Sequence, residues 1–314
     1  MILGLTMGAT SAGKIIAIGR RRTLLMCCLI GIFGVSITLV ENFYMMIIGR
    51  TIYGFACGIQ TVATPRYIEE YVPVQIYSTC LGTYCFSQNF GNLFALFSGL
   101  LLPPDDDKPA LKASDMWLFI YAFPLVWYIA MAALLFTVVR LDSPKYSLVV
   151  DKKSQCIAVI HRIYKTGGSE EMAEEIAAFI SSTIQKQSTK VTYKEAFCSD
   201  EKYKRASWVN VVYIVFHELT GINVILTYSN TILENILGTK TSGFNARTGT
   251  YCISAANTLS SLVSIWFVRS FGRKTLLLYG HVGIALSHLL VAIFTITDVN
   301  YGVLAMICFF LFSY

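Results

Sequence analysis

One segment, Gly49–Pro73, constrains the architecture more than any other, and it reads GRTIYGFACGIQTVATPRYIEEYVP. Its three glycines recur at close to four-residue spacing, which predicts an apolar helix with one smooth face. Such a face lets a neighbouring helix approach closely inside a bilayer. An arginine near the start of an intramembrane helix is costly, so we expect Arg50 to face a partner or a water-filled cavity. We expect Pro65 to end the helix and Glu70 to lie in the loop beyond it.

The composition of the whole chain agrees with a membrane environment. The chain has 314 residues, of which 55% are hydrophobic and only 14% are charged. A soluble domain carries about 25% charged residues. The apolar residues come in runs of about 20, which is long enough to span a hydrocarbon core. We therefore predict an all-α polytopic membrane protein.

The charge and the cysteines exclude other classes of protein. The net charge of +6 does not indicate a nucleic-acid partner, because most basic residues lie in alternate loops, as the positive-inside rule expects. The nine cysteines form no Cys-x-x-Cys pair, so they predict small buried apolar side chains rather than a disulfide or metal framework. No nucleophile–base pair or phosphate-binding loop stands out. We therefore expect no enzyme activity, no metal and no cofactor.

The apolar runs predict nine membrane spans. They cover residues 1–18, 23–41, 44–64, 78–102, 117–139, 207–231, 248–268, 275–297 and 301–314. Because the chain starts and stops inside apolar runs, we expect it to be part of a longer protein, incomplete at both ends. The long polar segment predicts three parts: an N-terminal transmembrane half (1–146), a cytoplasmic helical linker (147–205) and a C-terminal transmembrane half (206–314).

An internal repeat relates the two transmembrane halves. The turn Gly19–Leu25 reads GRRRTLL, and the turn Gly272–Leu277 reads GRKTLL. Each joins two predicted spans. The repetition predicts two similar halves related by an axis along the membrane normal.

Several motifs resemble those of the sugar porters, the hexose-carrier branch of the major facilitator superfamily. Gly49–Pro73 resembles the fourth helix of these carriers with its following loop, and Arg140–Tyr146 resembles the signature that closes their sixth helix. His217–Ser229 resembles their seventh helix, although His217 and Glu218 stand where the family has two glutamines. The resemblance implies a twelve-helix bundle of two pseudo-repeated halves, of which this chain covers helices two to ten.

The resemblance also implies where a sugar would bind. Asn223 matches a sugar-binding asparagine of the seventh helix, and Asn257 matches one of the eighth. Gln88 is assigned to the sugar-binding glutamine of the fifth helix. His217 and Glu218 can hold hydroxyl groups by hydrogen bonds. Glu218 can alternatively carry a coupling proton or select a ligand that is not a neutral hexose. The structural alternative for these side chains is hydrogen bonding between helices.

A second set of residues corresponds to the gates and inner-face clamps of such carriers. These residues are Arg20, Arg50, Glu70, Asp142, Tyr228 and Arg273. We expect charged bridges at the inner face to hold the outward-open state and to break on switching. A plain basic stop signal is the alternative for the arginine-rich turn Gly19–Arg22.

The function implied is transport of a sugar, a hexose such as glucose, by alternating access. Facilitated diffusion and proton symport both remain open, with a proton as the candidate coupling ion. The sequence is also compatible with a carrier of a polyol or another organic solute, with a sugar-sensing receptor on a carrier fold, and with a non-transporting remnant. The expected partners are the sugar and the lipid bilayer, with no nucleic acid and no defined oligomeric state. We expect the plasma membrane as the location, with the 147–205 loop in the cytoplasm.

Overall fold

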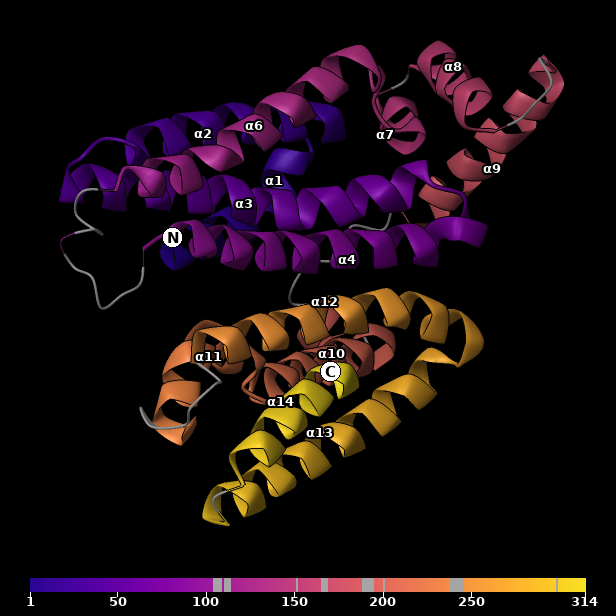
Figure 1. Cartoon of the computed structure of the whole chain (residues 1–314). Helices are drawn as coiled ribbons and strands as arrows, with labels where there is room; N and C mark the ends of the chain where they lie inside the picture. The colour runs from indigo at the N-terminus through magenta and orange to yellow at the C-terminus, as the bar shows by residue number, and fades with distance from the viewer. Residues whose placement is uncertain are drawn as a thin grey trace. The chain divides into compact units, whose positions relative to one another are not determined.

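The computed structural model describes residues 1–103, 109, 114–150, 152–164, 169–187, 195–199, 201–237, 246–297 and 299–314. The regular structure in these ranges is helical (Figure 1). The first helices are α1 (Ile2–Ile16), α2 (Arg20–Thr38), α3 (Phe43–Tyr71), α4 (Val74–Ser98) and α6 (Met116–Thr137). The next are α7 (Pro144–Val149), α8 (Lys153–Ile163), α9 (Glu170–Gln187) and the π-helical turn η2 (Glu195–Ser199). The last are α10 (Glu201–Glu218), α11 (Ile222–Leu237), α12 (Ala246–Ser270), α13 (Arg273–Ile296) and α14 (Asn300–Ser313).

The chain divides into two compact units. Unit 1 comprises Met1–Leu81 and Gly99–Thr189, and unit 2 comprises Gly82–Ser98 and Lys190–Tyr314. The helix α4 therefore contributes its first part to unit 1 and its second part, from Gly82 onward, to unit 2.

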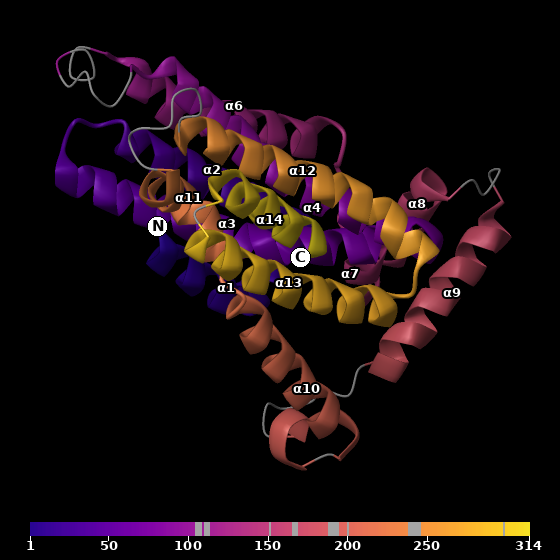
Figure 2. The ribbon, with the colours of Figure 1, turned by 60° about the horizontal axis from the view of Figure 1, so that its bottom comes forward.

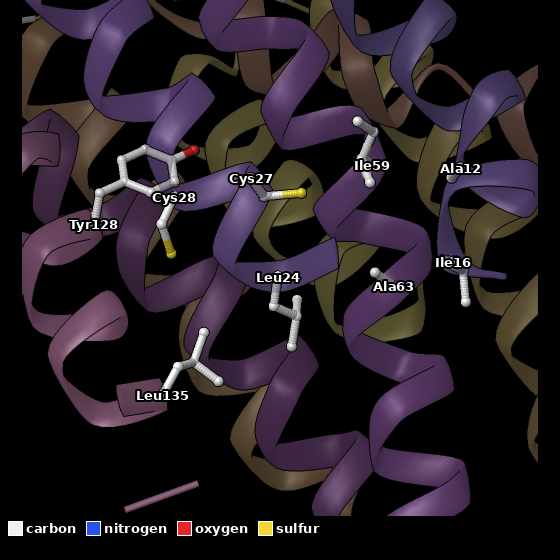
Figure 3. Close-up of a cluster of buried hydrophobic side chains, with 9 residues drawn as sticks. All are labelled: Ala12, Ile16, Leu24, Cys27, Cys28, Ile59, Ala63, Tyr128 and Leu135. Atoms are coloured by element: carbon white, nitrogen blue, oxygen red, sulfur yellow. The ribbon is translucent and has the colours of Figure 1, made fainter. Parts of the chain in front are cut away.

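Close helix packing builds unit 1. The helices α1 and α2 both pack along α3, and α6 packs on α2. The core between them contains Leu24, Cys27 and Cys28 of α2 and Tyr128 and Leu135 of α6 (Figure 3). The cysteines in this core behave as the small apolar side chains that the sequence predicts.

The glycine face of α3 is the contact surface for α1. A Cβ atom placed on Gly58 would collide with the carbonyl oxygen of Leu5, and one placed on Gly8 would collide with that of Phe55. Backbone thus lies directly against backbone, as the spacing of small residues predicts.

The prediction that Pro65 ends α3 is wrong. The helix continues to Tyr71 and includes Pro65 in its interior. A proline removes a single backbone hydrogen bond, and contacts elsewhere can offset that loss. The last turn of α3 carries Glu70, which an arginine of α2 and a serine beside α7 both contact.

The polar segment after α6 forms a small helical cap within unit 1. The sequence predicts a helical linker here. The helices are present as α8 and α9, and they bury a small core of their own around Cys156, Ile160, Ala173 and Ala177. Burial raises the pKa of the Cys156 thiol, so this cysteine is a packing residue.

Unit 2 is a bundle of α10 to α14 with the second part of α4. The helices α13 and α14 lie side by side, and α12 packs against α11 and α14 (Figure 2). The side chains of its buried core are aliphatic except for one phenylalanine. It consists of Ile222, Leu233, Ile253, Ile284, Val303, Ile307, Phe310 and Leu311.

Many of these helices suit a bilayer. Five described stretches are long and apolar enough to cross it, namely Arg20–Thr38, Met116–Thr137, Tyr203–Asn235, Thr248–Val268 and Lys274–Ile296. The shorter apolar helices are Ile2–Ile16 and Tyr301–Ser313. Each predicted span coincides with a described helix or, for the sixth span, with two helices separated by a break.

Candidate functional site

The break in the sixth span lies at Gly221. The helix α10 ends at Glu218, α11 begins at Ile222, and Gly221 has a φ of +80°. Glycine adopts this left-handed conformation without the steric cost that a Cβ atom brings. The side chain of Thr220 donates to the carbonyl oxygen of His217 at 2.7 Å and satisfies one backbone acceptor at the end of α10. Breaks of this kind expose backbone groups where a helix lines a cavity.

A pocket of about 340 Å³ lies in unit 2 beside the start of α11. It is lined from three helices, α4, α11 and α12. The lining residues are Asn89, Asn92, Ala95, Leu96, Asn223, Leu226, Thr227, Ser254 and Asn257. Four of these residues are asparagines, and the described lining contains no charged side chain. Amides and hydroxyls offer both donors and acceptors, which suits a neutral ligand rich in hydroxyl groups.

Hydrogen bonds fix several of the asparagines. The Nδ2 atom of Asn257, a residue only 8% exposed, donates to Oδ1 of Asn89 at 3.3 Å. The hydroxyl of Thr258 donates to the backbone carbonyl of Asn89 at 3.3 Å. Across the break, Nδ2 of Asn223 donates to Oε2 of Glu218 at 2.7 Å. Neighbouring polar groups therefore hold three of the four lining asparagines, Asn89, Asn223 and Asn257.

The predicted sugar-binding residues divide into two groups. Asn223 and Asn257 line the pocket. Glu218 does not line it but accepts a hydrogen bond from Asn223. Gln88 is exposed on α4 and is absent from the lining. His217 lies in a ring cluster instead, stacked on Tyr314 at 4.4 Å between ring centroids.

The sequence prediction does not include four polar residues of the pocket, namely Asn89, Asn92, Thr227 and Ser254. The spacing of Asn89 and Asn92 places both on one face of α4, so this signal is present in the sequence. Thr227 lines the pocket, whereas the predicted gating residue Tyr228 is 58% exposed and lies outside the lining. The backbone of Tyr228 departs from helical geometry, with a φ of −107° and a ψ of 16°.

A separate charged cluster joins α2, α3 and α7 inside unit 1. Nη2 of Arg20 lies 2.7 Å from Oε1 of Glu70, and both side chains are largely buried. The other oxygen of Glu70 accepts a hydrogen bond from the Ser143 hydroxyl at 2.6 Å. Oδ1 of Asp142 accepts from the backbone N–H groups of Arg20 and Arg21, each at 3.2 Å. This carboxylate therefore lies at the N-terminus of α2, where the helix dipole favours negative charge.

The remaining gating residues lie elsewhere or are not described. Arg50 occupies the second turn of α3, at the opposite end from Glu70, and its guanidinium lies 4.3 Å from the ring centroid of Tyr121. Arg50 therefore does not join the charged cluster. Arg273 is the first residue of α13, and its side chain lies outside the described part of the structure.

The sequence matches a known protein family and is similar to several characterised proteins. A family model described as "Sugar (and other) transporter" matches residues 1–314. Facilitated glucose transporter member 3 of solute carrier family 2 from Ovis aries is 27% identical over 98% of this chain and 60% of its own length. Sugar transporter ERD6-like 10 of Arabidopsis thaliana is 25% identical over 95% of the chain and 60% of its own length. The probable inositol transporter 2 of the same plant is 24% identical over 91% and 47%, respectively.

Solved structures resemble the chain over its whole length. The proton:xylose symporter XylE bound to 6-bromo-6-deoxy-D-glucose has a TM-score of 0.82 at 20% identity, covering 99% of this chain and 67% of XylE. The partially occluded inward-open form of XylE from E. coli has a TM-score of 0.77 at 19% identity, with coverage of 99% and 69%. This chain spans about 60% of the length of the first curated relatives that it matches.

Proposed function

This chain belongs to the sugar (and other) transporter family, and from that premise we propose that the whole protein carries a hexose such as glucose across a membrane. The predicted all-α bundle of the major facilitator superfamily is confirmed by the solved structures. The chain is part of a multi-pass integral membrane protein, and the plasma membrane is our proposal for its location. Such carriers work by exposing a midplane site to each side in turn.

The neutral pocket beside the Gly221 break carries the proposal. Its described lining offers amides and hydroxyls without charge, which matches a neutral ligand with several hydroxyl groups. An anionic substrate would need a cationic partner, and the described lining has none. We assign binding to Asn223 and Asn257, and we add Asn89 and Asn92.

The proposal also covers the inner-face clamp, the gating residues and the coupling mode. The Arg20–Glu70–Asp142 cluster acts as an inner-face clamp, and Arg50 and Tyr228 act in gating. The coupling mode is either facilitated diffusion or proton symport, with Glu218 as the proton carrier in the second case. A polyol is the second candidate substrate, because a probable inositol transporter is among the relatives and the pocket suits either ligand.

The test is uptake of D-glucose and myo-inositol by the complete protein in proteoliposomes. Asn223→Ala should reduce uptake about 10-fold or more, because a ligand hydroxyl would lose its hydrogen-bond partner. Asn230→Ala is the matched control. Asn230 lies on the same helix and also donates to a glutamate at 2.7 Å, but it is absent from the pocket lining.

The results of these assays distinguish a carrier from a sensor and from a non-transporting remnant. A loss of uptake of about 10-fold or more in Asn223→Ala, with uptake preserved in Asn230→Ala, supports the carrier and its site. Uptake unaffected by Asn223→Ala refutes the site. Saturable binding without flux indicates a sensor, and neither binding nor flux indicates a remnant. A pH gradient that drives accumulation distinguishes proton symport from facilitated diffusion.

A further inference from the structure

We propose that Glu218 is a positioning residue, which holds the Asn223 amide so that its carbonyl oxygen serves the ligand as a hydrogen-bond acceptor. The inference rests on the proposed function, and it assigns Glu218 a role different from direct contact with sugar. It also names the chemical requirement that this position places on the substrate.

The geometry places the two residues on opposite sides of the helix break. Glu218 is the last residue of α10, and Asn223 is the second residue of α11. Oε2 of Glu218 lies 2.7 Å from Nδ2 of Asn223, which is a short distance for an N–H···O bond. Asn223 belongs to the pocket lining, and Glu218 does not. Glu218 therefore acts on a ligand through its neighbour.

The chemistry of the pair determines which way the amide faces. An asparagine amide has an acceptor oxygen and a donor nitrogen of similar size, so its orientation follows from its partners. An ionised carboxylate has acceptors only, so Glu218 must receive the Nδ2 group. The Oδ1 atom of Asn223 is then left for the pocket.

The other amide pair of the pocket, Asn257 with Asn89, has no partner that can only accept. Asn257 donates to Asn89 at 3.3 Å, but each partner carries both a donor and an acceptor. Such a pair is satisfied in either direction. The fixed orientation of the Asn223 amide therefore depends on Glu218. The described lining residues include no other carboxylate that could fix an amide in this way.

The ligand group that meets Oδ1 of Asn223 must consequently be a donor. A hydroxyl meets this requirement, whereas an ether, a carbonyl or a C–F group does not. Sites built to hydrogen-bond a hydroxyl discriminate against analogues that lack it, because the acceptor of the site is then left without its ligand partner.

The experiment exchanges the two chemical groups in the complete protein and measures D-glucose and myo-inositol uptake. Asn223→Asp places two carboxylates at the 2.7 Å contact and should raise KM at least 10-fold. Glu218→Gln permits either amide orientation and should raise KM about 3- to 10-fold with little change in kcat. The double variant Glu218→Gln/Asn223→Asp restores one donor facing one acceptor, so its KM should return to within about 3-fold of wild type.

A matched control and a second readout isolate the effect. Glu234→Gln alters the equivalent asparagine–glutamate pair of α11 outside the pocket and should leave KM unchanged. One deoxyfluoro-D-glucose analogue carries fluorine in place of the hydroxyl that meets Asn223. This analogue should fail to inhibit uptake by the wild-type protein. Glu218→Gln should reduce the discrimination at that one position, because the amide can then offer its N–H group.

The inference is overturned if the double variant is as impaired as Asn223→Asp, or if Glu218→Gln changes neither KM nor the analogue pattern. In that case sensitivity to Asn223→Ala would leave the proposed function standing. Absence of uptake and of binding by the wild-type protein would refute both proposals together.

Discussion

Glu70 is the residue on which the contacts of the charged cluster converge. One carboxylate oxygen pairs with Arg20, and the other accepts from Ser143. We predict that Glu70→Ala lowers the free energy of unfolding by about 3 kcal/mol, because it leaves the largely buried Arg20 guanidinium without its carboxylate. The thermal unfolding of the purified protein, followed by size-exclusion chromatography, measures the change.

The neighbouring residue provides the control for this prediction. Glu69 pairs with Arg66 at 3.3 Å, but both side chains are more than half exposed. Exposed pairs contribute about 0–1 kcal/mol, so Glu69→Ala should hardly shift the unfolding temperature. Equal shifts for the two variants would show that the cluster contributes no more than a surface ion pair.

Individual residues also show how far sequence patterns predict a site. Asn223 and Asn257 could be chosen because each lies at a fixed spacing from a recognisable glycine motif. On α4 the polar residues Gln88, Asn89 and Asn92 lie close together, and periodicity does not determine the rotation of a helix about its own axis. That rotation depends on packing, and it places Asn89 and Asn92 in the pocket lining and Gln88 outside it.

At the scale of the element, the contact between α1 and α3 depends on glycine. A Cβ atom on Gly8 would meet backbone atoms of α3, including Cα of Gly58 at 3.1 Å, whereas one on Gly13 would meet nothing within 4 Å. We predict that Gly8→Ala destabilises unit 1 by about 1–3 kcal/mol, because backbone on both sides must shift. Gly13→Ala should stabilise it by about 0.4–1 kcal/mol through helix propensity and chain entropy.

The two substitutions are chemically identical and lie on one helix, so their difference isolates packing. Thermal unfolding of both variants in the same detergent is the measurement. If Gly8→Ala unfolds at the wild-type temperature, the backbones of α1 and α3 do not lie in direct contact.

Helix ends are harder to predict than helix positions. The spans follow from apolar run length, which is a local property of the sequence. The end of α3 is not local, because Pro65 favours termination while Glu70 gains two partners only if the helix continues to Tyr71. Likewise, the small core of α8 and α9 depends on how two amphipathic helices meet.

At the scale of the whole molecule, the alternation of basic turns predicts an orientation in the membrane. We predict that an impermeant maleimide applied to intact cells labels Glu41→Cys and does not label Lys152→Cys. Both residues are exposed, but the first lies in the short turn between α2 and α3 and the second lies in the polar segment before α8. Labelling is compared with the parent protein, which carries nine cysteines of its own.

Permeabilised cells supply the control, since both introduced cysteines should then react. Labelling of Lys152→Cys in intact cells would place the 147–205 segment outside and reverse the orientation that the positive-inside rule predicts. Such a result would also move the Arg20–Glu70 cluster to the outer face.

The break at Gly221 has a consequence for the fit between protein and lipid. The apolar stretch Tyr203–Asn235 has 33 residues, and a straight helix of that length would measure roughly 50 Å. The hydrocarbon layer is only about 30 Å thick. A rigid rod could reconcile the two lengths only by a steep tilt or by deforming the bilayer. Because α10 ends at Glu218 and α11 begins at Ile222, this stretch consists of two shorter helices that need not share one axis, rather than one rod of that length.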